Sequence, residues 1–331
     1  MSRVSVRTTG LSLSSFAAAL LLVGCANGGS FSGQGNSPLP EAGHFLIDQD
    51  FADPDVLTTP DSFFAYATNS AAANVQVATS SDLEHWTVSQ TDALPELPAW
   101  ATTGKTWAPD VSQVGPNQFV MYYVAASVDP AAQCIGAATS SSPDGPFTPV
   151  GDIPLVCPAD EGGAIDPASF LDADGTRYLL WKNDGNCCGL DTWLQIAKVS
   201  PDGAQLTSTP TKLIKQTLPW EGHVVEAPTL IRHDGSYALL YSANDYSAGE
   251  YKIGYATASS VLGPYTKHDA PLLSTTLSKN GYSGPGGQDV VQSKNDTDSL
   301  IFHSWNDSLI YRGMNAVKMN WANGHPVIEI P

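Results

Sequence analysis

The sequence predicts an all-β protein built as a five-bladed β-propeller, and three observations lead to this prediction. No window shows sustained helical periodicity, and the apolar and aromatic runs are short and end in turn residues such as Asp-Gly or Asn-Asp. The 331 residues include 29 Gly and 24 Pro, and only 15% are charged, which favours many turns over long exposed helices. Finally, one sequence unit recurs along the chain, which is the signature of a repeat architecture.

The unit occurs five times and opens each time with a similar short segment. The five openings are FADPDV (51–56), WAPDV (107–111), IDPAS (165–169), VEAPT (225–229) and PGGQDVV (285–291). Successive prolines of the first four openings are 55, 58 and 61 residues apart (Pro54, Pro109, Pro167 and Pro228). Each opening leads into a short strand, an aromatic-rich strand, a strand of the IGYATAS type and a last strand. Four short strands repeated around an axis make a propeller, so the openings should face one shared cavity.

The N-terminus has the build of an export signal. Arg3 and Arg7 precede an apolar stretch, Leu11 to Val23, which is too short to span a bilayer comfortably. The stretch ends in LLVGC, which resembles a bacterial lipobox, so we expect Cys25 to be lipidated; an ordinary signal peptide is the alternative. These features predict a lipoprotein signal peptide over 1–24, a flexible Gly/Ser/Asn-rich linker over 25–44 and the propeller over 45–331. Either kind of signal predicts export, with lipid anchoring at the cell envelope or free secretion.

The charge balance restricts the possible partners. The chain has 15 Lys and Arg against 33 Asp and Glu, a formal net charge of −18. Such a protein attracts neither nucleic acid nor an anionic membrane surface. We therefore expect no nucleic acid partner, membrane contact only through a lipid anchor, a neutral ligand and a monomeric protein.

The remaining cysteines indicate disulfide chemistry rather than a metal site. In an oxidising compartment Cys134 and Cys157 are expected to form a disulfide. Cys187 and Cys188 are adjacent, and either a vicinal disulfide or two free thiols fit the sequence. No pair has zinc spacing, and we predict no metal ligands.

Four carboxyl groups stand in the openings of the first four units: Asp53, Asp110, Asp166 and Glu226. A single Asp-Pro is common in turns. Three acids immediately before the proline, or one residue further back, are harder to explain that way, and Asp53, Asp166 and Glu226 should converge.

Two carboxyl groups about 6.5–9.5 Å apart are the equipment of inverting glycoside hydrolysis. The proton donor needs a raised pKa, which an apolar wall or a negative charge supplies. Glu226, flanked in sequence by Val224, Val225 and Ala227, suits that role.

These motifs resemble those of one enzyme family. ADPDV, WAPDV, AIDPASFLDADGTRYL and VEAPTLIRHDGSYALLYS, in this order and spacing, are similar to glycoside hydrolase family 43 over residues 45 to 331. The resemblance implies a five-bladed propeller and inverting hydrolysis of arabinose- or xylose-containing plant polysaccharides. By motif, Asp53 corresponds to the general base, Asp166 to the pKa modulator and Glu226 to the general acid. Glu221, in WEGHVVEAP, is a rival acid but lacks the following proline and the strand.

Three further residues are predicted to bind the substrate. YRGMNAVKMNWANGHPVI resembles the family's closing segment, whose arginine reaches the substrate; here that residue is Arg312. Trp107, directly before the Ala-Pro of the second opening, is the best aromatic platform for a sugar, and Trp181, Trp193 and Trp220 are weaker candidates. Asp110 is assigned to substrate binding because it belongs to the set of opening acids.

The sequence departs from the family in GPGGQDVV. Many members carry a His after Gly-Pro-Gly that helps to hold a central ion, but Gly287 stands there, followed by Gln288 and Asp289. We therefore predict that no cofactor is required and do not assign a central calcium. His303, in IFHSW, is an alternative axial histidine.

The leading functional prediction is an α-L-arabinofuranosidase that acts on arabino- or xylo-oligosaccharides or the corresponding polysaccharides. A β-xylosidase and an endo-arabinanase of the same family are the closest competitors. A surface lipoprotein that binds glycans without cleaving them is the alternative from another class, but a pure binder has no need of three converging acids. A levansucrase-like enzyme fits the EAP and WAPD motifs less well.

Overall fold

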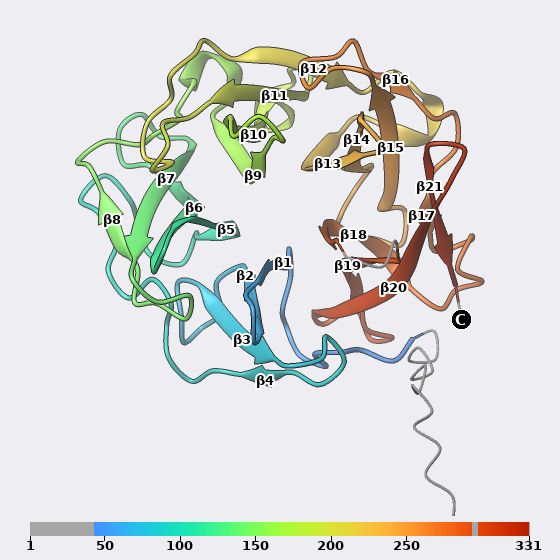
Figure 1. Cartoon of the computed structure of the whole chain (residues 1–331), viewed down its shortest axis with the longest axis horizontal. Coiled ribbons are helices and arrows are strands. Elements are labelled where there is room, and N and C mark those ends of the chain that lie inside the picture. The colour runs from blue at the N-terminus through green and yellow to red at the C-terminus, as the bar shows by residue number, and fades with distance from the viewer. Residues whose placement is uncertain (1–42, 293–296, 331) are drawn as a thin grey trace, which may run out of the picture. The chain divides into compact units, whose positions relative to one another are not determined.

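Five antiparallel sheets make up the part of the chain that the structure, a computed structural model, describes: residues 43–292 and 297–330. The sheets are arranged around a common axis as the blades of a propeller (Figure 1). The prediction of an all-β, five-bladed propeller is confirmed. The predicted signal peptide, Cys25 and all but the last two residues of the linker lie outside the described residues. Within these ranges no helix is long and apolar enough to cross a membrane.

Each blade consists of four consecutive strands joined in chain order. Blade one comprises β1 (Asp55–Thr58), β2 (Phe63–Ala67), β3 (Gln76–Ser80) and β4 (Thr87–Val88). Blade two comprises β5 (Trp107–Gly115), β6 (Gln118–Ala126), β7 (Gln133–Ser140) and β8 (Thr148–Val150). Blade three comprises β9 (Ala164–Leu171), β10 (Arg177–Asn183), β11 (Trp193–Lys198) and β12 (Thr211–Lys215).

The last two blades follow the same plan. Blade four comprises β13 (Val225–His233), β14 (Ser236–Ala243), β15 (Lys252–Ala258) and β16 (Thr266–Lys267), with β17 (Leu273–Ser274) also paired to β15. Blade five comprises β18 (Ser283–Val291), β19 (Asp298–Trp305), β20 (Arg312–Ala322) and β21 (His325–Glu329). Three single-turn 3₁₀ helices lie in the connections: η1 (Ala159–Glu161), η2 (Gly185–Cys188) and η3 (Pro219–Glu221).

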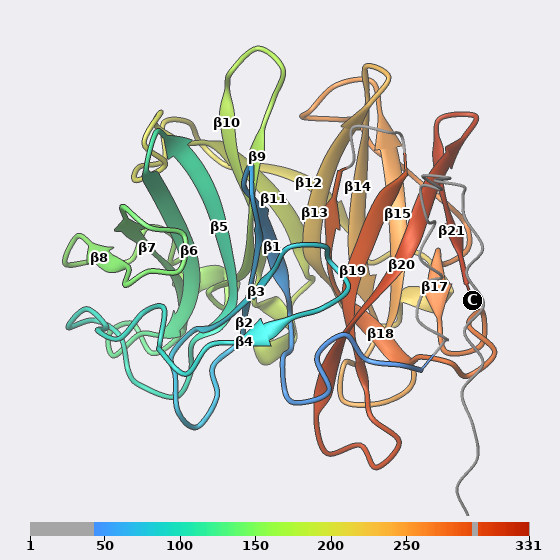
Figure 2. The same cartoon turned by 60° about the horizontal axis from the view of Figure 1, so that its bottom comes forward.

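The first strand of every blade lies nearest the axis. β1, β5, β9, β13 and β18 surround the centre of the ring and each contacts its neighbours in that order (Figures 1 and 2). The hydrophobic core lies between adjacent blades, where apolar faces pack against one another; Tyr66 of blade one, for example, clusters with Met121 and Phe147 of blade two. Burial of such large side chains is the main stabilising contribution to a sheet-on-sheet contact.

The ring is closed by backbone bonds between the start of the described chain and blade five. The Leu46 and Phe51 amides donate to the carbonyls of Met314 and Arg312, at 2.8 and 2.9 Å. Because Arg312 begins β20, this closure fixes it beside the opening of blade one.

The structure joins both predicted cysteine pairs. Cys134, on β7, is bonded to Cys157 in the connection before η1. Cys187 and Cys188, in η2, are bonded to each other, which is the first of the two alternatives that the sequence left open.

The five openings share an unusual backbone conformation. One residue in each has a positive φ, followed by proline in the first four: Asp53 (54°), Ala108 (38°), Asp166 (53°), Ala227 (48°) and Gly287 (56°). In blades two to five the pairing register of the first two strands shifts near this residue, as in a β-bulge. Positive φ is rare outside glycine and concentrates at functional sites. The openings are therefore strained in the same way at the same place.

This register refines the prediction that the acids occupy equivalent positions. Asp53 and Asp166 share the positive-φ position, whereas Glu226 stands one residue earlier and Asp110 two residues later. These offsets determine which of the two cavities described below each carboxyl side chain faces.

Candidate active site

One pocket, with a cavity of about 350 Å³, gathers five of the predicted site residues at the edge where the first strands begin. They are Asp53, Trp107, Asp166, Glu226 and Arg312. We call this cavity the active-site pocket. Its volume lies at the lower end of the range for small-molecule sites, about 300–1,000 Å³.

Asp53 is surrounded by groups that favour its ionised form. Its Oδ2 accepts a hydrogen bond from Thr68 Oγ1 at 2.7 Å, and its Oδ1 lies 3.6 Å from Arg312 Nη1. His303 Nδ1 lies 3.0 Å from the Asp53 backbone nitrogen and 3.2 Å from Oδ1. Although burial opposes ionisation, Arg312, His303 and Thr68 together hold the pKa of Asp53 well below its usual value. A carboxylate that stays ionised is suited to accept a proton from water.

Glu226 does not face the apolar wall that its neighbours in sequence suggested. Its Oε2 accepts a hydrogen bond from Lys182 Nζ at 3.0 Å, and its Oε1 accepts one from the Tyr251 hydroxyl at 2.8 Å. Lys182, on β10, is fully buried and also lies 3.5 Å from Asp184 Oδ1. Burying an ammonium group is costly unless carboxylates surround it, so Lys182 and the acids around it stabilise one another.

Asp166 is the carboxyl group whose protonation is most perturbed in this pocket. Burial and the neighbouring Glu226 carboxylate raise the pKa of Asp166, while Lys182 opposes the rise. The backbone amide of Ala227, next to Glu226, donates to Asp166 Oδ2 at 2.9 Å. Asp166 therefore keeps its proton to higher pH than an ordinary aspartate does.

Arg312 is held by aromatic rings as well as by Asp53. Its guanidinium lies 5.2 Å from the ring centre of Tyr246 and 5.8 Å from that of Trp305. The indole of Trp305 in turn donates to the Tyr246 carbonyl at 2.8 Å. The arginine is therefore fixed at the pocket rim with part of its donor set turned toward the cavity.

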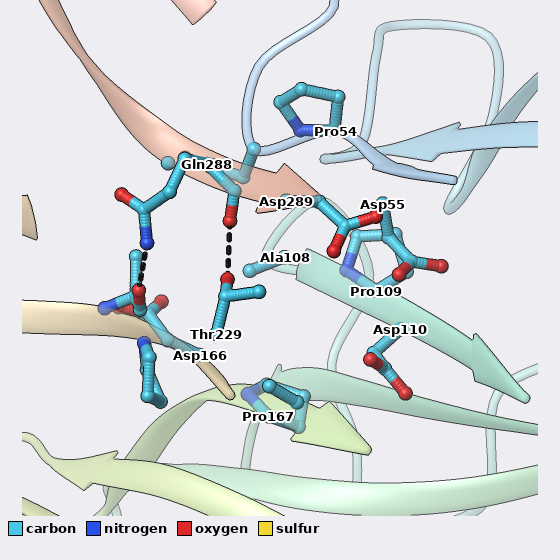
Figure 3. A pocket seen from close by; sticks show the side chains of 15 residues that line it. Pro54, Asp55, Ala108, Pro109, Asp110, Asp166, Pro167, Thr229, Gln288 and Asp289 are labelled. Carbon is cyan, nitrogen blue, oxygen red and sulfur yellow. Dashed lines mark hydrogen bonds between the residues drawn. The ribbon is translucent and has the colours of Figure 1, made fainter. Parts of the chain in front are cut away.

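Asp110 is the predicted substrate-binding residue that the structure does not place in the active-site pocket. It lines a narrow cavity of about 40 Å³ on the axis, which we call the axial channel, together with Asp55 and Asp289 (Figure 3). The channel has room for water but not for a sugar. Asp53 and Asp166 line both cavities, so the channel adjoins the pocket.

The channel acids connect neighbouring blades. Asp289 Oδ2 accepts the backbone amide of Val56 at 2.9 Å. Asp55 Oδ2 accepts that of Val111, and Asp110 Oδ2 accepts that of Ser169, both at 2.8 Å. In each case the donor belongs to the next blade around the ring. The two-residue offset turns the Asp110 side chain into the channel and away from the active-site pocket, so its position does not support the predicted role in substrate binding.

The residues around Gly287 do not fit the central ion of the family. A Cβ atom at Gly287 would lie 2.6 Å from Asp53 Oδ1 and 2.6 Å from His303 Nδ1, so no histidine side chain fits there. The ring of His303 fills this space and contacts Asp53 and, at 3.5 Å, Arg312. Among the described residues, no group of three or more His, Cys, Asp or Glu side chains is arranged to hold a metal ion.

The rival acid and the weaker tryptophan candidates belong to the framework. Glu221 is fully buried and accepts hydrogen bonds from Lys267, Tyr241 and two backbone amides. Trp181 lies in the core, and Trp220 stacks on Tyr241 with ring centres 6.0 Å apart. Trp193, on β11, contacts Lys212 and Lys215 instead of the pocket.

Among the pocket residues that sequence reasoning missed, Lys182, Tyr246 and Tyr251 contact Glu226 or Arg312. Lys182 left a signal, because a lysine at the end of the apolar run YLLW needs a buried carboxylate partner. Tyr246 and Tyr251 lie in the β14–β15 connection, and no pattern in that loop distinguishes the buried Tyr251 from the exposed Tyr246.

A propeller with three carboxyl groups in unlike surroundings, a fixed guanidinium and aromatic rings around one cavity has the equipment of a glycoside hydrolase. The sequence model of the glycosyl hydrolases family 43 matches residues 45–326, and the chain belongs to that family. The predicted family and the prediction of an enzyme are confirmed.

Individual relatives extend over most of the chain. Extracellular endo-alpha-(1->5)-L-arabinanase 1 of Bacillus subtilis is 27% identical over 292 residues, which are 83% of this chain and 86% of that protein. The crystal structure of a thermostable family-43 glycoside hydrolase superposes with a TM-score of 0.75 at 30% identity, covering 88% of this chain and 95% of the other. An endo-1,4-beta-xylanase of Bacteroides thetaiotaomicron gives a TM-score of 0.73 at 30% identity, covering 86% and 96%.

Proposed function

We propose that the enzyme hydrolyses α-L-arabinofuranosyl linkages of arabinan or arabinoxylan with inversion of the anomeric centre. The observation that supports this most is the convergence of Asp53, Asp166 and Glu226 on one pocket in unlike electrostatic surroundings. The arabinanase relative supports arabinose as the sugar.

In the proposed mechanism Asp53 is the general base and Glu226 the general acid. Asp53 accepts a proton from the attacking water, whose oxygen forms a bond to the anomeric carbon. The bond from that carbon to the leaving oxygen breaks, and Glu226 gives its proton to that oxygen. Asp166 acts as pKa modulator, because its carboxyl group is buried in the same pocket and bonded to the backbone next to Glu226. Arg312 and Trp107 hold the hydroxyls and the apolar face of the sugar.

Cleavage of β-xylosyl linkages is the second candidate, and the likeness to the Bacteroides endo-1,4-beta-xylanase favours it. Within a single pentose pocket, arabinofuranose and xylopyranose differ in ring size and in the direction of the scissile bond. A binding protein without activity is not favoured, because family 43 comprises hydrolases and all three acids of the predicted set are in the pocket.

We also propose that the protein is exported and anchored through Cys25. The extracellular arabinanase relative and the LLVGC segment support export. Labelling of cells with a radioactive fatty acid should mark the wild-type protein, and Cys25→Ala should abolish the label. Equal labelling of both proteins would contradict the anchor.

Product analysis tests the proposed function. Aryl α-L-arabinofuranoside, aryl β-xyloside, arabinan and arabinoxylan are each incubated with the enzyme, and proton NMR follows the anomeric configuration of the first product. We expect arabinose release from the arabinofuranoside and the polysaccharides with inverted configuration. Retained configuration would contradict the mechanism, and release from the xyloside alone would establish the second candidate.

A further inference from the structure

The Cys187–Cys188 disulfide belongs to the wall of the active-site pocket. The connection from β10 to β11 contains η2, and Asp184, Asn186 and Cys187 of this connection line the pocket. The bond joins Cys187 to its neighbour Cys188 within the same 3₁₀ turn. It has no part in the proton transfers proposed above, so its place beside the reacting groups calls for another explanation.

Hydrogen bonds fix the base of this connection without help from the disulfide. The Asp184 amide donates to the Gly163 carbonyl at 3.0 Å. The side-chain amide of Asn183 donates to the Asp191 carbonyl at 3.1 Å, which ties the two ends of the connection together. The Asp184 carboxylate, 3.5 Å from Lys182 Nζ, therefore keeps its position whether or not the disulfide is present.

The tip of the connection, residues 186–190, stands out into solvent, and every residue of it is exposed. One sulfur of the disulfide packs against the neighbouring segment: Cys187 Sγ lies 3.7 Å from the Gly162 carbonyl oxygen, in the turn before β9. Gly162 has a φ of 89°, and a Cβ atom there would lie 3.3 Å from Cys187 Sγ and 2.5 Å from the Asp184 carbonyl oxygen. Glycine at 162 therefore permits the close approach of the tip to this turn.

A disulfide between adjacent residues closes a small ring through the peptide bond that joins them, which restricts the torsions of both residues. Without that ring an exposed tip has to become ordered when a sugar binds, and the lost entropy weakens binding. We propose that the Cys187–Cys188 disulfide is a positioning element that orders the tip in advance, so that Asn186 and Cys187 form a fixed wall for the sugar, and that reduction by a dithiol loosens this wall. The inference rests on the proposed function, because hydrolysis of the sugar is its readout.

Exposure makes this disulfide the accessible one of the two in the described chain. Cys134 is fully buried in the core between blades one and two, and Cys157 packs against the same cluster. A thiolate of the dithiol attacks one sulfur of the Cys187–Cys188 bond, forms a mixed disulfide and releases the other cysteine as a thiolate. The second thiol of the reagent then displaces the remaining cysteine. Two electrons and two protons pass to the pair, and the reagent becomes a cyclic disulfide.

Affinity for the sugar then depends on the redox state around the enzyme. Disulfides persist in oxidising compartments, whereas cytosolic thiols keep accessible cysteines reduced. The pocket therefore has its fixed wall only where the surroundings are oxidising.

Steady-state kinetics of oxidised and dithiothreitol-treated wild type test the proposal on an aryl glycoside that the oxidised enzyme cleaves. Alkylation and mass spectrometry first verify that Cys187 and Cys188 are reduced while Cys134 and Cys157 remain bonded. Reduction should raise KM about three- to tenfold and leave kcat within about twofold, because the wall contacts the sugar equally in the ground and transition states. Tm should change by less than about 3 °C, because closing so short a loop constrains the unfolded chain little.

The double variant Cys187→Ser/Cys188→Ser is the matched control for reduction elsewhere in the chain. It should show the raised KM without dithiothreitol, and the reagent should not change its KM further. An unchanged KM in reduced wild type, a loss confined to kcat, or an equal response of the double variant to the reagent would overturn the proposal. Oxidised wild type that cleaves neither the aryl arabinofuranoside nor the aryl xyloside would refute the proposed function itself, so the two failures are distinguishable.

Discussion

Two sets of three carboxyl groups lie along the same axis and differ in what they contact. The pocket carboxyls are Asp53, Asp166 and Glu226, and the channel carboxyls are Asp55, Asp110 and Asp289. The pocket carboxyls meet ionisable or hydroxyl side chains, among them Arg312, Lys182 and Tyr251. Each channel carboxyl accepts a backbone amide from the next blade.

This difference shows that the contacts of an acidic residue depend on its position within the opening segment of a blade. Asp53 and Asp55 are two residues apart in one segment, yet Arg312 keeps the first ionised while burial raises the pKa of the second well above its usual value. Asp166 has features of both sets. It lines the pocket, and like the channel carboxyls it accepts a backbone amide of the next blade, that of Ala227, at its Oδ2. The link from blade four to blade five is made by Thr229, whose hydroxyl donates to the Gln288 carbonyl at 2.7 Å (Figure 3).

The largest expected effect separates Glu226 from the buried Glu221 five residues earlier. Glu226→Gln should lower kcat by about 10²–10⁴-fold, because an amide cannot deliver a proton. Glu221→Gln should instead destabilise the fold by about 3–5 kcal/mol, because Lys267 loses its buried partner. Kinetics and thermal unfolding of both variants check this. If Glu226→Gln kept its activity within tenfold of wild type, the contrast between a proton-donating Glu226 and a structural Glu221 would be wrong.

Lys182 is expected to have the next largest effect. Lys182→Met should lower kcat/KM by about 10- to 100-fold, because Glu226 and Asp166 lose the cation that they surround. Lys182 lowers the pKa of Asp166, so removal of Lys182 lets Asp166 keep its proton to higher pH. The alkaline limb of the pH profile should therefore move upward, by about one pH unit.

The control for this variant is Lys212→Met, which removes an exposed lysine paired with Glu161. It should leave both kcat/KM and the pH profile unchanged. A downward shift of the alkaline limb in Lys182→Met, or no shift, would show that Lys182 does not set the protonation of Asp166.

The sequence predicted the fold and the carboxyl groups of the pocket for a physical reason. Repeated Pro54, Pro109, Pro167 and Pro228 marked equivalent strands, and equivalent strands of a propeller meet at the axis. Convergence of Asp53, Asp166 and Glu226 followed from that topology alone. Arg312 was found by motif resemblance, since nothing in its own segment indicates that ring closure places it beside Asp53.

The rest depended on backbone detail that a sequence pattern does not show. Asp110 stands two residues after the positive-φ Ala108, whereas Asp53 is itself the positive-φ residue of its opening. Only Asp53 therefore reaches the active-site pocket. The partners of Glu226 were misjudged because Val224 and Ala227 are its neighbours along the chain, while Lys182 and Tyr251 are its neighbours in space.

The smallest expected effect concerns the pH dependence of stability in the channel. Burial raises the pKa of Asp110 to about 7, above its value in the unfolded chain. Between about pH 4 and 7 the folded protein therefore binds more protons than the unfolded chain, and stability falls as pH rises. Asp110→Asn keeps an acceptor for Ser169 but does not titrate. The loss of Tm from pH 4 to 8 should thus be smaller in the variant, by on the order of 5 °C; an identical loss would contradict the assignment.

The most direct test of the division between pocket and channel is a comparison of Asp53→Ala with Asp55→Ala, measuring kcat and Tm for each. Asp53→Ala should lower kcat by about 10²–10⁴-fold while Tm changes little, because the general base is lost from a partly open site. Asp55→Ala should retain kcat within about threefold and lose about 1–3 kcal/mol of stability, because the buried Val111 amide loses its acceptor. An inactive Asp55→Ala with unchanged Tm, or an active Asp53→Ala, would contradict the account.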